Sequence, residues 1–209
     1  MNISSVMRET ASQTAGPFVH IGLAPLDAGI AVFERHFGNV LATPATRGER
    51  IRIEGRVFDG IGTPVRDALI EIWQANAAGK YRHPADRQPG REVDESFRGW
   101  GRAASDAETG AYRFETIKPG SVTGRDGRAM APHISFWIVA RGINLGLHTR
   151  MYFSDEIDAN LRDSVFNLIE SESRRKTLIA QREAAQEGLV VYRFDIRLQG
   201  EGETVFFDV

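Results

Sequence analysis

Cysteine is absent from this chain of 209 residues. Without cysteine there can be no disulfide framework, no thiolate zinc site, no iron–sulfur cluster and no cysteine nucleophile. A metal ion, if one is used, must therefore be held by histidine, tyrosine or carboxylate side chains. The length suits one large domain or two small ones and is sufficient for a substantial hydrophobic core.

A surplus of basic charge is also missing. The 26 lysine and arginine residues and the 28 acidic residues leave a formal net charge of −2, whereas nucleic-acid-binding proteins normally carry a positive excess. Lysine is scarce beside arginine, which is favoured where planar carboxylates are bound, although we expect most of these arginines to be solvated surface residues. We therefore expect no nucleic-acid partner.

Long apolar runs and several catalytic signatures are lacking too. The strongest apolar run, at 136–140, is far shorter than the 18 or more residues of a membrane-spanning helix. Residues 1–14 are polar and lack the apolar stretch of a signal peptide. No Gly-x-Ser-x-Gly elbow, phosphate-binding loop or complete dinucleotide fingerprint occurs. These absences predict a soluble cytoplasmic protein without a membrane partner.

Residues 1–49 differ from the rest of the chain. Glycine and proline punctuate them and no periodicity is sustained, which indicates an irregular segment. They are nevertheless too apolar for a disordered tail, with Phe18, Ile21 and Leu23 among their apolar residues. We expect residues 1–49 to form an extended arm that packs on a partner chain or on its own core, and residues 50–209 to form the core domain.

Short alternating strands are indicated from residue 50 onward. We expect them at 51–57, 68–73, 112–117, 133–140, 147–153, 190–198 and 204–207. The Gly- and Pro-rich region 75–110 is predicted to be a long loop, and two helical stretches are predicted at 155–170 and 171–187. The pattern predicts an all-β fold: a β-sandwich with long loops, an irregular N-terminal arm and two short helices near the C-terminal third.

The segment most typical of a functional site is 130–135, Met-Ala-Pro-His-Ile-Ser, which opens a buried strand. Alternate residues of a strand lie on the same face, so a His-x-His pair here could chelate one metal ion. Ser135 stands at the second of these positions, which leaves His133 alone. A single histidine at the start of a strand is equally well explained as a hydrogen-bonded structural residue.

Four motifs resemble those of the intradiol ring-cleaving dioxygenases. They are Glu-Ile-Trp-Gln-Ala-Asn at 71–76, Tyr-Arg-His at 81–83, Thr-Ile-Lys-Pro-Gly at 116–120 and Pro-His-Ile at 132–134. Within that family, segments 10–23, 140–144, 148–150 and 199–208 resemble the alpha chains of those members that are built from paired alpha and beta chains. The resemblance implies a partner beta chain and a higher alpha–beta hetero-oligomer.

The resemblance also implies a ferric site made of two tyrosines and two histidines, a set in which hard anionic oxygen stabilises Fe(III). Tyr81 and His133 match the first tyrosine and the first histidine. Val122 and Ser135 stand where the second tyrosine and the second histidine are expected, and Met130 stands where iron-bearing members have an arginine. We therefore expect Fe(III) to be bound by the beta chain and not by this chain, with Tyr81 and His133 as vestigial ligand positions.

In such complexes, the resemblance implies, the alpha chain lends its arm and an arginine to the cleft of the beta chain. In that cleft protocatechuate is cleaved with O2 to 3-carboxy-cis,cis-muconate, which is a step of the beta-ketoadipate pathway. The corresponding residues here are Thr14, Gly16, Pro17, Phe18 and Arg141, which we expect to bind substrate without being catalytic. A guanidinium suits a carboxylate-bearing catechol because charge-assisted hydrogen bonds join the two.

Two other functions stay open from the sequence alone. The chain could be a self-sufficient metalloenzyme that completes Tyr81 and His133 with other ligands, or a purely structural partner subunit without substrate contact. Arg141 could equally lie in a salt bridge, and the turn at 14–18 could serve only to dock the arm. The metal content of the isolated chain and the activity of an Arg141 variant complex distinguish these possibilities.

Overall fold

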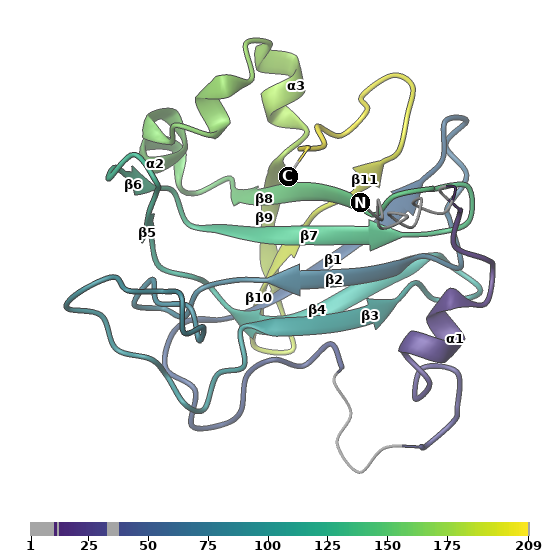
Figure 1. Ribbon diagram of the computed structural model, residues 1–209, viewed down its shortest axis with the longest axis horizontal. Helices are drawn as coiled ribbons and strands as arrows, with labels where there is room; N and C mark the ends of the chain where they lie inside the picture. Colours follow the sequence, from purple (N-terminus) through teal and green to yellow (C-terminus); the bar gives the residue numbers. More distant parts are fainter. Residues whose placement is uncertain (1–10, 12, 33–37, 209) are drawn as a thin grey trace, which may run out of the picture.

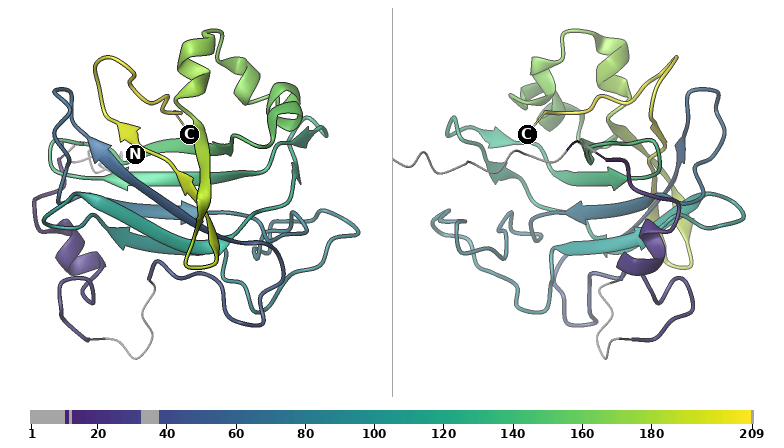
Figure 2. Two further views of the ribbon diagram at one scale, coloured as in Figure 1. Left: turned by 180° about the vertical axis from the view of Figure 1, so that it is seen from behind. Right: turned by 45° about the vertical axis from the view of Figure 1, so that its right-hand side comes forward.

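The computed structural model describes all residues except 1–10, 12, 33–37 and 209. Its strands form two packed layers (Figures 1 and 2). One layer contains β4 (Ala111–Ile117), β1 (Arg50–Phe58), β10 (Leu189–Arg193) and β9 (Ile179–Gln186), and the other contains β8 (Leu147–Phe153), β7 (His133–Val139), β2 (Leu69–Trp73) and β3 (Trp100–Ala104). A short parallel pairing of β8 with β9 joins the layers, and a separate ribbon pairs β5 (Val122–Thr123) with β6 (Ala129–Met130). The predicted all-β sandwich is confirmed.

The core lies between the two layers because each strand turns alternate apolar residues inward. On β7, Ile134, Phe136 and Ile138 are buried, whereas Ser135 and Trp137 on the opposite face are only partly buried. The ring of Phe136 lies 5.2 Å from that of Phe194, centroid to centroid. Each such buried aromatic ring contributes roughly 1.5–3 kcal/mol, so the register that the alternation sets is strongly held.

One glycine allows the backbone of β1 to approach a neighbouring segment closely. A Cβ atom added at Gly55 would lie 1.9 Å from the carbonyl oxygen of Phe194. Residue 194 lies between β10 and β11 (Ile196–Arg197), where the strand predicted at 190–198 is interrupted. β10 and β11 pair with successive parts of β1, so the interruption lets the chain follow that strand.

The helix predicted at 171–187 is wrong beyond its first turn. α3 (Glu172–Lys176) ends early, and the following residues form strand β9. Glu187 and Gly188 both have positive φ, at 52° and 82°, and connect β9 to β10 as a two-residue hairpin turn. Ladder pairing with β10 therefore overrides the helical propensity of the Ala-, Gln- and Arg-rich residues in β9.

The single helix predicted at 155–170 is also wrong. The segment contains two short pieces, α2 (Ile157–Arg162) and η1 (Phe166–Leu168). Asp163 separates them: its buried carboxylate accepts hydrogen bonds from the backbone N–H groups of Ala131, Val165 and Phe166 at 2.8–2.9 Å. Leu161 and Leu168, on the two separate pieces, are 62% and 75% exposed.

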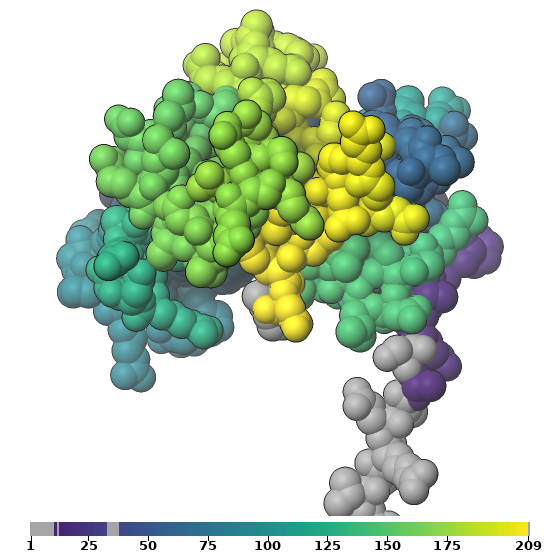
Figure 3. Space-filling model, turned by 90° about the horizontal axis from the view of Figure 1, so that it is seen from above, coloured from purple at the N-terminus to yellow at the C-terminus, as the bar shows by residue number. Residues whose placement is uncertain are grey.

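Two further expectations need correction. The loop predicted at 75–110 contains β3, which pairs with β2. The strand predicted at 204–207 is reduced to one bridge between Phe207 and His148, and the C-terminal segment lies beside the helical region that precedes β9 (Figure 3). No helix among the described residues is long and apolar enough to cross a membrane.

The described part of the arm includes the short helix α1 (Val19–Leu23). Arg102 donates from Nη1 to the carbonyl oxygen of Leu23 at 2.8 Å, and the N–H of Ala104 donates to Asp27 at 3.2 Å, so the arm is attached to β3. Leu41, further along, already belongs to the core. The boundary at residue 49 and the packing of the arm on a partner chain stay predictions.

Candidate functional site

The structure brings the arm and Arg141 together, although they are more than a hundred residues apart in the sequence. Ala15 forms a parallel bridge with Arg141, which lies just beyond the end of β7. The N–H of Gly142 donates to Oγ1 of Thr14 at 2.5 Å. The substrate-binding residues proposed from the sequence therefore share one surface at this end of the sheet.

The arm turns directly after this contact. The N–H of Val19 donates to the carbonyl oxygen of Gly16 at 3.2 Å, which closes the turn that contains Pro17 and begins α1. Phe18 is the other central residue of this turn and is 72% exposed. An aromatic ring that is this exposed does not pack against the rest of its own chain, so it is available to contact another molecule.

Arg141 is held from inside the chain by Asp67, which sequence analysis did not single out. The Nε atom of Arg141 lies 3.0 Å from Oδ2 of Asp67. The Asp67 side chain is 10% exposed, whereas that of Arg141 is 66% exposed. The second carboxylate oxygen of Asp67 is buried and has no hydrogen-bond partner among the described residues. The salt bridge considered from the sequence is present, and it leaves most of the guanidinium accessible.

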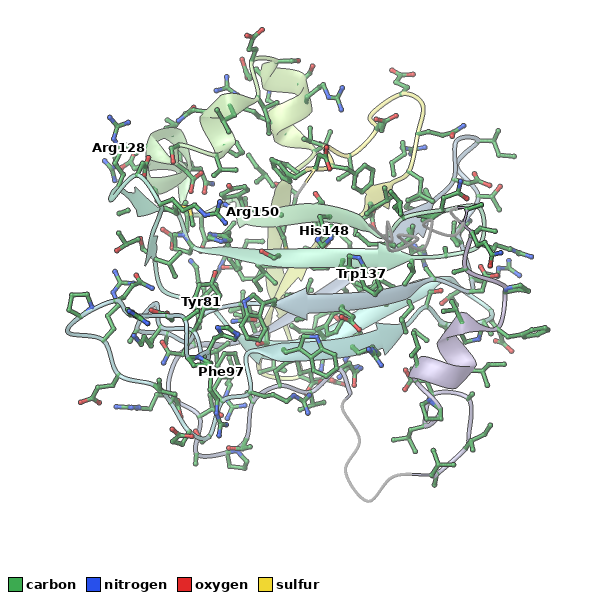
Figure 4. The ribbon with its side chains drawn as sticks, in the orientation of Figure 1. Tyr81, Phe97, Arg128, Trp137, His148 and Arg150 are labelled. Atoms are coloured by element: carbon green, nitrogen blue, oxygen red, sulfur yellow. The ribbon has the colours of Figure 1, made fainter. Side chains whose placement is uncertain are left out.

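The ligand positions that the resemblance implies on β7, His133 and Ser135, lie near the opposite end of this strand, away from the core side. Ser135 pairs with Trp73 of β2 on one side and with Arg150 of β8 on the other. The ring of Tyr81 stacks on Trp73, with centroids 5.8 Å apart and planes 5° from parallel. Tyr81 and Arg150 can be followed in Figure 4. Tyr81 is therefore held as an aromatic packing partner beside the position of Ser135.

His133 is a buried histidine held by a backbone contact. Its Nδ1 lies 2.8 Å from the carbonyl oxygen of Ala131, so Nδ1 carries the proton and donates it. Burial lowers the pKa of His133 to about 4, and the nearby charge of Arg150 acts in the same direction. Burial also raises the pKa of Tyr81, against the opposing effect of Arg150. Both groups are therefore neutral around pH 7.

These residues do not fit a ferric ion. Val122, at the position of the second tyrosine, is a buried apolar residue whose strand partner is Met130. Ser135 replaces the second histidine, and its cross-strand neighbour is the cation Arg150. Among the described residues no group of three or more His, Asp or Glu side chains could hold a metal. Tyr81 and His133 are two neutral groups under the influence of the Arg150 charge, so the site lacks both the number of ligands and the negative charge that a ferric ion needs.

Comparison with known proteins identifies the family. The family model described as "Dioxygenase" matches residues 38–200. The alpha chain of protocatechuate 3,4-dioxygenase from Pseudomonas putida is 49% identical over 203 residues, which cover 97% of this chain and 98% of that protein. The chain belongs to the intradiol dioxygenase family.

Other members of the intradiol dioxygenase family match as well. The beta chain of protocatechuate 3,4-dioxygenase from Burkholderia cepacia is 40% identical over 188 residues, which cover 87% of this chain and 75% of that one. The solved structure of catechol 1,2-dioxygenase from Acinetobacter sp. ADP1 matches with a TM-score of 0.57 at 21% identity, over 76% of this chain and 55% of that one. At this identity the last match supports the fold alone. The predicted resemblance is confirmed.

Two residues of these surfaces escaped the sequence analysis. Asp67 lies two residues before β2, and Arg150 is a partly buried residue of β8. No local pattern signals either contact, because the partners of both residues come from distant segments. Intradiol dioxygenases depend on non-haem iron, and in this member Arg150 stands next to one of the two lost ligand positions.

Proposed function

We propose that this chain is the alpha subunit of a protocatechuate 3,4-dioxygenase. In the proposed complex an iron-bearing beta chain cleaves protocatechuate by intradiol addition of O2, which gives 3-carboxy-cis,cis-muconate. The full-length similarity to alpha chains at 49% and 41% identity supports the assignment, and the similarity to a beta chain supports a related partner. Higher alpha–beta assembly is part of the proposal, whereas a cytoplasmic location stays a prediction from the sequence.

The observation that carries the proposal is the difference between the two ends of β7. At one end, two of the four ligand positions are lost and the remaining pair, Tyr81 and His133, serves in packing and in a backbone hydrogen bond. At the other end, Thr14 and Arg141 are joined by the arm and remain accessible. A chain with an intact accessory surface and no ligand set of its own suits a subunit that completes a partner's cleft.

In that cleft Arg141 would bind the carboxylate of protocatechuate. A guanidinium presents several N–H donors in a plane, and Asp67 engages Nε, so the remaining donors can serve the substrate. Thr14, Gly16, Pro17 and Phe18 would form a wall beside it. The Phe18 ring would contact the aromatic ring of the substrate without adding a polar group.

A purely structural role is the second candidate, and the salt bridge to Asp67 favours it. If the role of Arg141 is confined to that ion pair, the pair fastens the end of β7 and touches no substrate. The position of Arg141 is compatible with either role, because Asp67 engages only the Nε atom of the guanidinium and the Arg141 side chain is still 66% exposed. Activity measurements are therefore needed to separate the two.

The test is Arg141→Ala in a complex co-expressed with the beta chain. Assembly and iron content should equal those of the wild type, while kcat/KM for protocatechuate falls about 10- to 150-fold, the range for a lost hydrogen bond to a charged group. Plain catechol, which lacks the carboxylate, should suffer a smaller loss. Arg162→Ala, an exposed arginine on α2, is the matched control and should leave the rate unchanged.

Two outcomes would overturn parts of the proposal. A normally assembled Arg141→Ala complex with wild-type turnover would assign the structural role to Arg141. Iron bound stoichiometrically to this chain in the absence of the beta chain would instead revive the self-sufficient metalloenzyme. Metal analysis of the separated chains measures the second outcome directly.

A further inference from the structure

A cavity of about 730 Å³ opens on the outer face of β7 and β8. Its walls come from the β5–β6 ribbon and its turn, from the outer face of the two strands, from the segment between α2 and η1, and from the end of the chain. Figure 1 shows where these elements lie, and Figure 4 labels His148 and Arg150, which line the cavity. Ser135, at the position of the lost histidine, lines it together with Arg150. The volume lies within the range of small-molecule sites.

Arg150 brings a positive charge to this cavity that no acidic side chain neutralises directly. None of the ion pairs among the described residues involves it. Its Nη1 lies 3.7 Å from the sulfur of Met130, and its side chain also hydrogen-bonds the hydroxyl of Tyr152. Both acceptors are uncharged and the sulfur is a weak one, and a guanidinium has five N–H donors, so the positive charge of Arg150 is not neutralised and donors remain for an anion.

The groups around Arg150 are neutral or already engaged. Tyr81 stacks on Trp73, and Nδ1 of His133 donates to the carbonyl oxygen of Ala131. Burial also raises the pKa of Tyr152, whose hydroxyl donates to the carboxylate of Asp163 at 3.1 Å. Asp163 accepts three further hydrogen bonds from backbone N–H groups, which use its oxygens. Tyr152 also hydrogen-bonds Arg150, but none of these neighbours forms an ion pair with its guanidinium among the described residues.

The acidic residues that line the cavity are exposed. Asp126 accepts a hydrogen bond from the N–H of Arg128 at 3.0 Å within its own turn, and Asp208 lies near the end of the chain. The exposed Arg125 offsets part of their charge. Charges exposed to water are well screened, so the charge of the less exposed Arg150 dominates the interior.

Apolar side chains complete the lining. Met130, Val165, Leu168 and Phe207 contribute to it, and Leu168 is 75% exposed. A cavity that combines one fixed cation with apolar walls suits a ligand that combines a carboxylate with a flat apolar body. An inorganic anion would use the cation but leave the apolar walls in contact with water.

We propose that this cavity binds a small aromatic carboxylate, with the carboxylate on Arg150 and the ring against the apolar wall. The lost metal position of this chain would thus have become a ligand-binding site. Arg150 pairs with Ser135 near the start of β7, about 20 Å from Arg141 at a strand rise of about 3.3 Å per residue. The inference therefore goes beyond the proposed function and does not depend on Arg141.

The experiment counts ligands on the intact alpha–beta complex. Isothermal titration and equilibrium dialysis with 4-hydroxybenzoate should give two sites per alpha–beta pair, one in the partner's cleft and one at Arg150. Arg150→Gln should remove one site by weakening it about 10- to 150-fold, and Arg150→Lys should weaken it less, because the charge is kept. Arg128→Gln, an exposed arginine outside the lining, is the matched control and should retain two sites.

Three results would overturn the inference. They are a single site in the wild-type complex, two unchanged sites in Arg150→Gln, and inorganic phosphate binding at the Arg150 site as tightly as 4-hydroxybenzoate. The number of 4-hydroxybenzoate sites on the wild-type complex tests the inference even if a variant fails to assemble. Arg141→Ala separates the two proposals, because it should weaken the site in the cleft and leave the Arg150 site intact, whereas failure of the proposed role of Arg141 would leave both sites unchanged.

Discussion

Asp67→Asn tests whether the buried carboxylate positions Arg141 for substrate. The substitution keeps the shape of the side chain and removes the charge that lies 3.0 Å from Nε of Arg141. A hydrogen bond between charged groups contributes about 1.5–3 kcal/mol, but the 66% exposure of the arginine reduces this toward the values of surface pairs. A loss of about 1 kcal/mol, or roughly fivefold in kcat/KM, is therefore expected.

The assay is oxygen uptake by the co-expressed complex over a range of protocatechuate concentrations. A positioning role raises KM more than it lowers kcat, since the arginine is proposed to bind the carboxylate and not the reacting atoms. Asp158→Asn, an exposed acid on α2, is the control for a general change in charge and should have no effect.

A double-mutant cycle gives the decisive comparison. If Asp67 acts through Arg141, Asp67→Asn should cost nothing further once Arg141→Ala is present, so a coupling energy of about 1 kcal/mol is expected. Equal losses in both backgrounds would refute the positioning role and would indicate that Asp67 stabilises the fold independently. Wild-type kinetics for the single variant would show that the ion pair is dispensable.

The remaining predictions concern the folded state and the lost metal position. Because the pKa of His133 is about 4 in the fold and about 6.5 when unfolded, stability should fall as the pH drops below about 6.5, by about 2 kcal/mol at pH 5; urea unfolding of His133→Gln, which should lack this loss, measures it. The double substitution Val122→Tyr and Ser135→His should raise the iron affinity of this chain in metal analysis, and no change would contradict the ligand assignment. Gly55→Ala should cost several kcal/mol or prevent folding, because its Cβ would overlap the carbonyl oxygen of Phe194; near-normal thermal unfolding would refute that close approach.

Alternation along the chain was sufficient to predict the sandwich. β4 and β7 bury alternate side chains along most of their length, and a period of two can be seen without knowledge of the neighbours. The motifs around Tyr81 and His133 likewise sufficed to predict the family and the two missing ligands. These features depend on the identity and spacing of nearby residues, which a sequence contains in full.

Long-range contacts decided what the sequence alone could not. Residues 179–186 form a strand because β10 offers them a ladder, against their helical composition. Asp163 divides a predicted helix because its carboxylate accepts from Ala131 and Tyr152 of other segments as well as from N–H groups of its own turn. The salt bridge from Asp67 to Arg141 joins residues 74 positions apart, and Arg150 meets Ser135 only through strand pairing. Local propensities are worth tenths of a kcal/mol per residue, so tertiary pairing and buried hydrogen bonds of about 1 kcal/mol or more prevail wherever the two conflict.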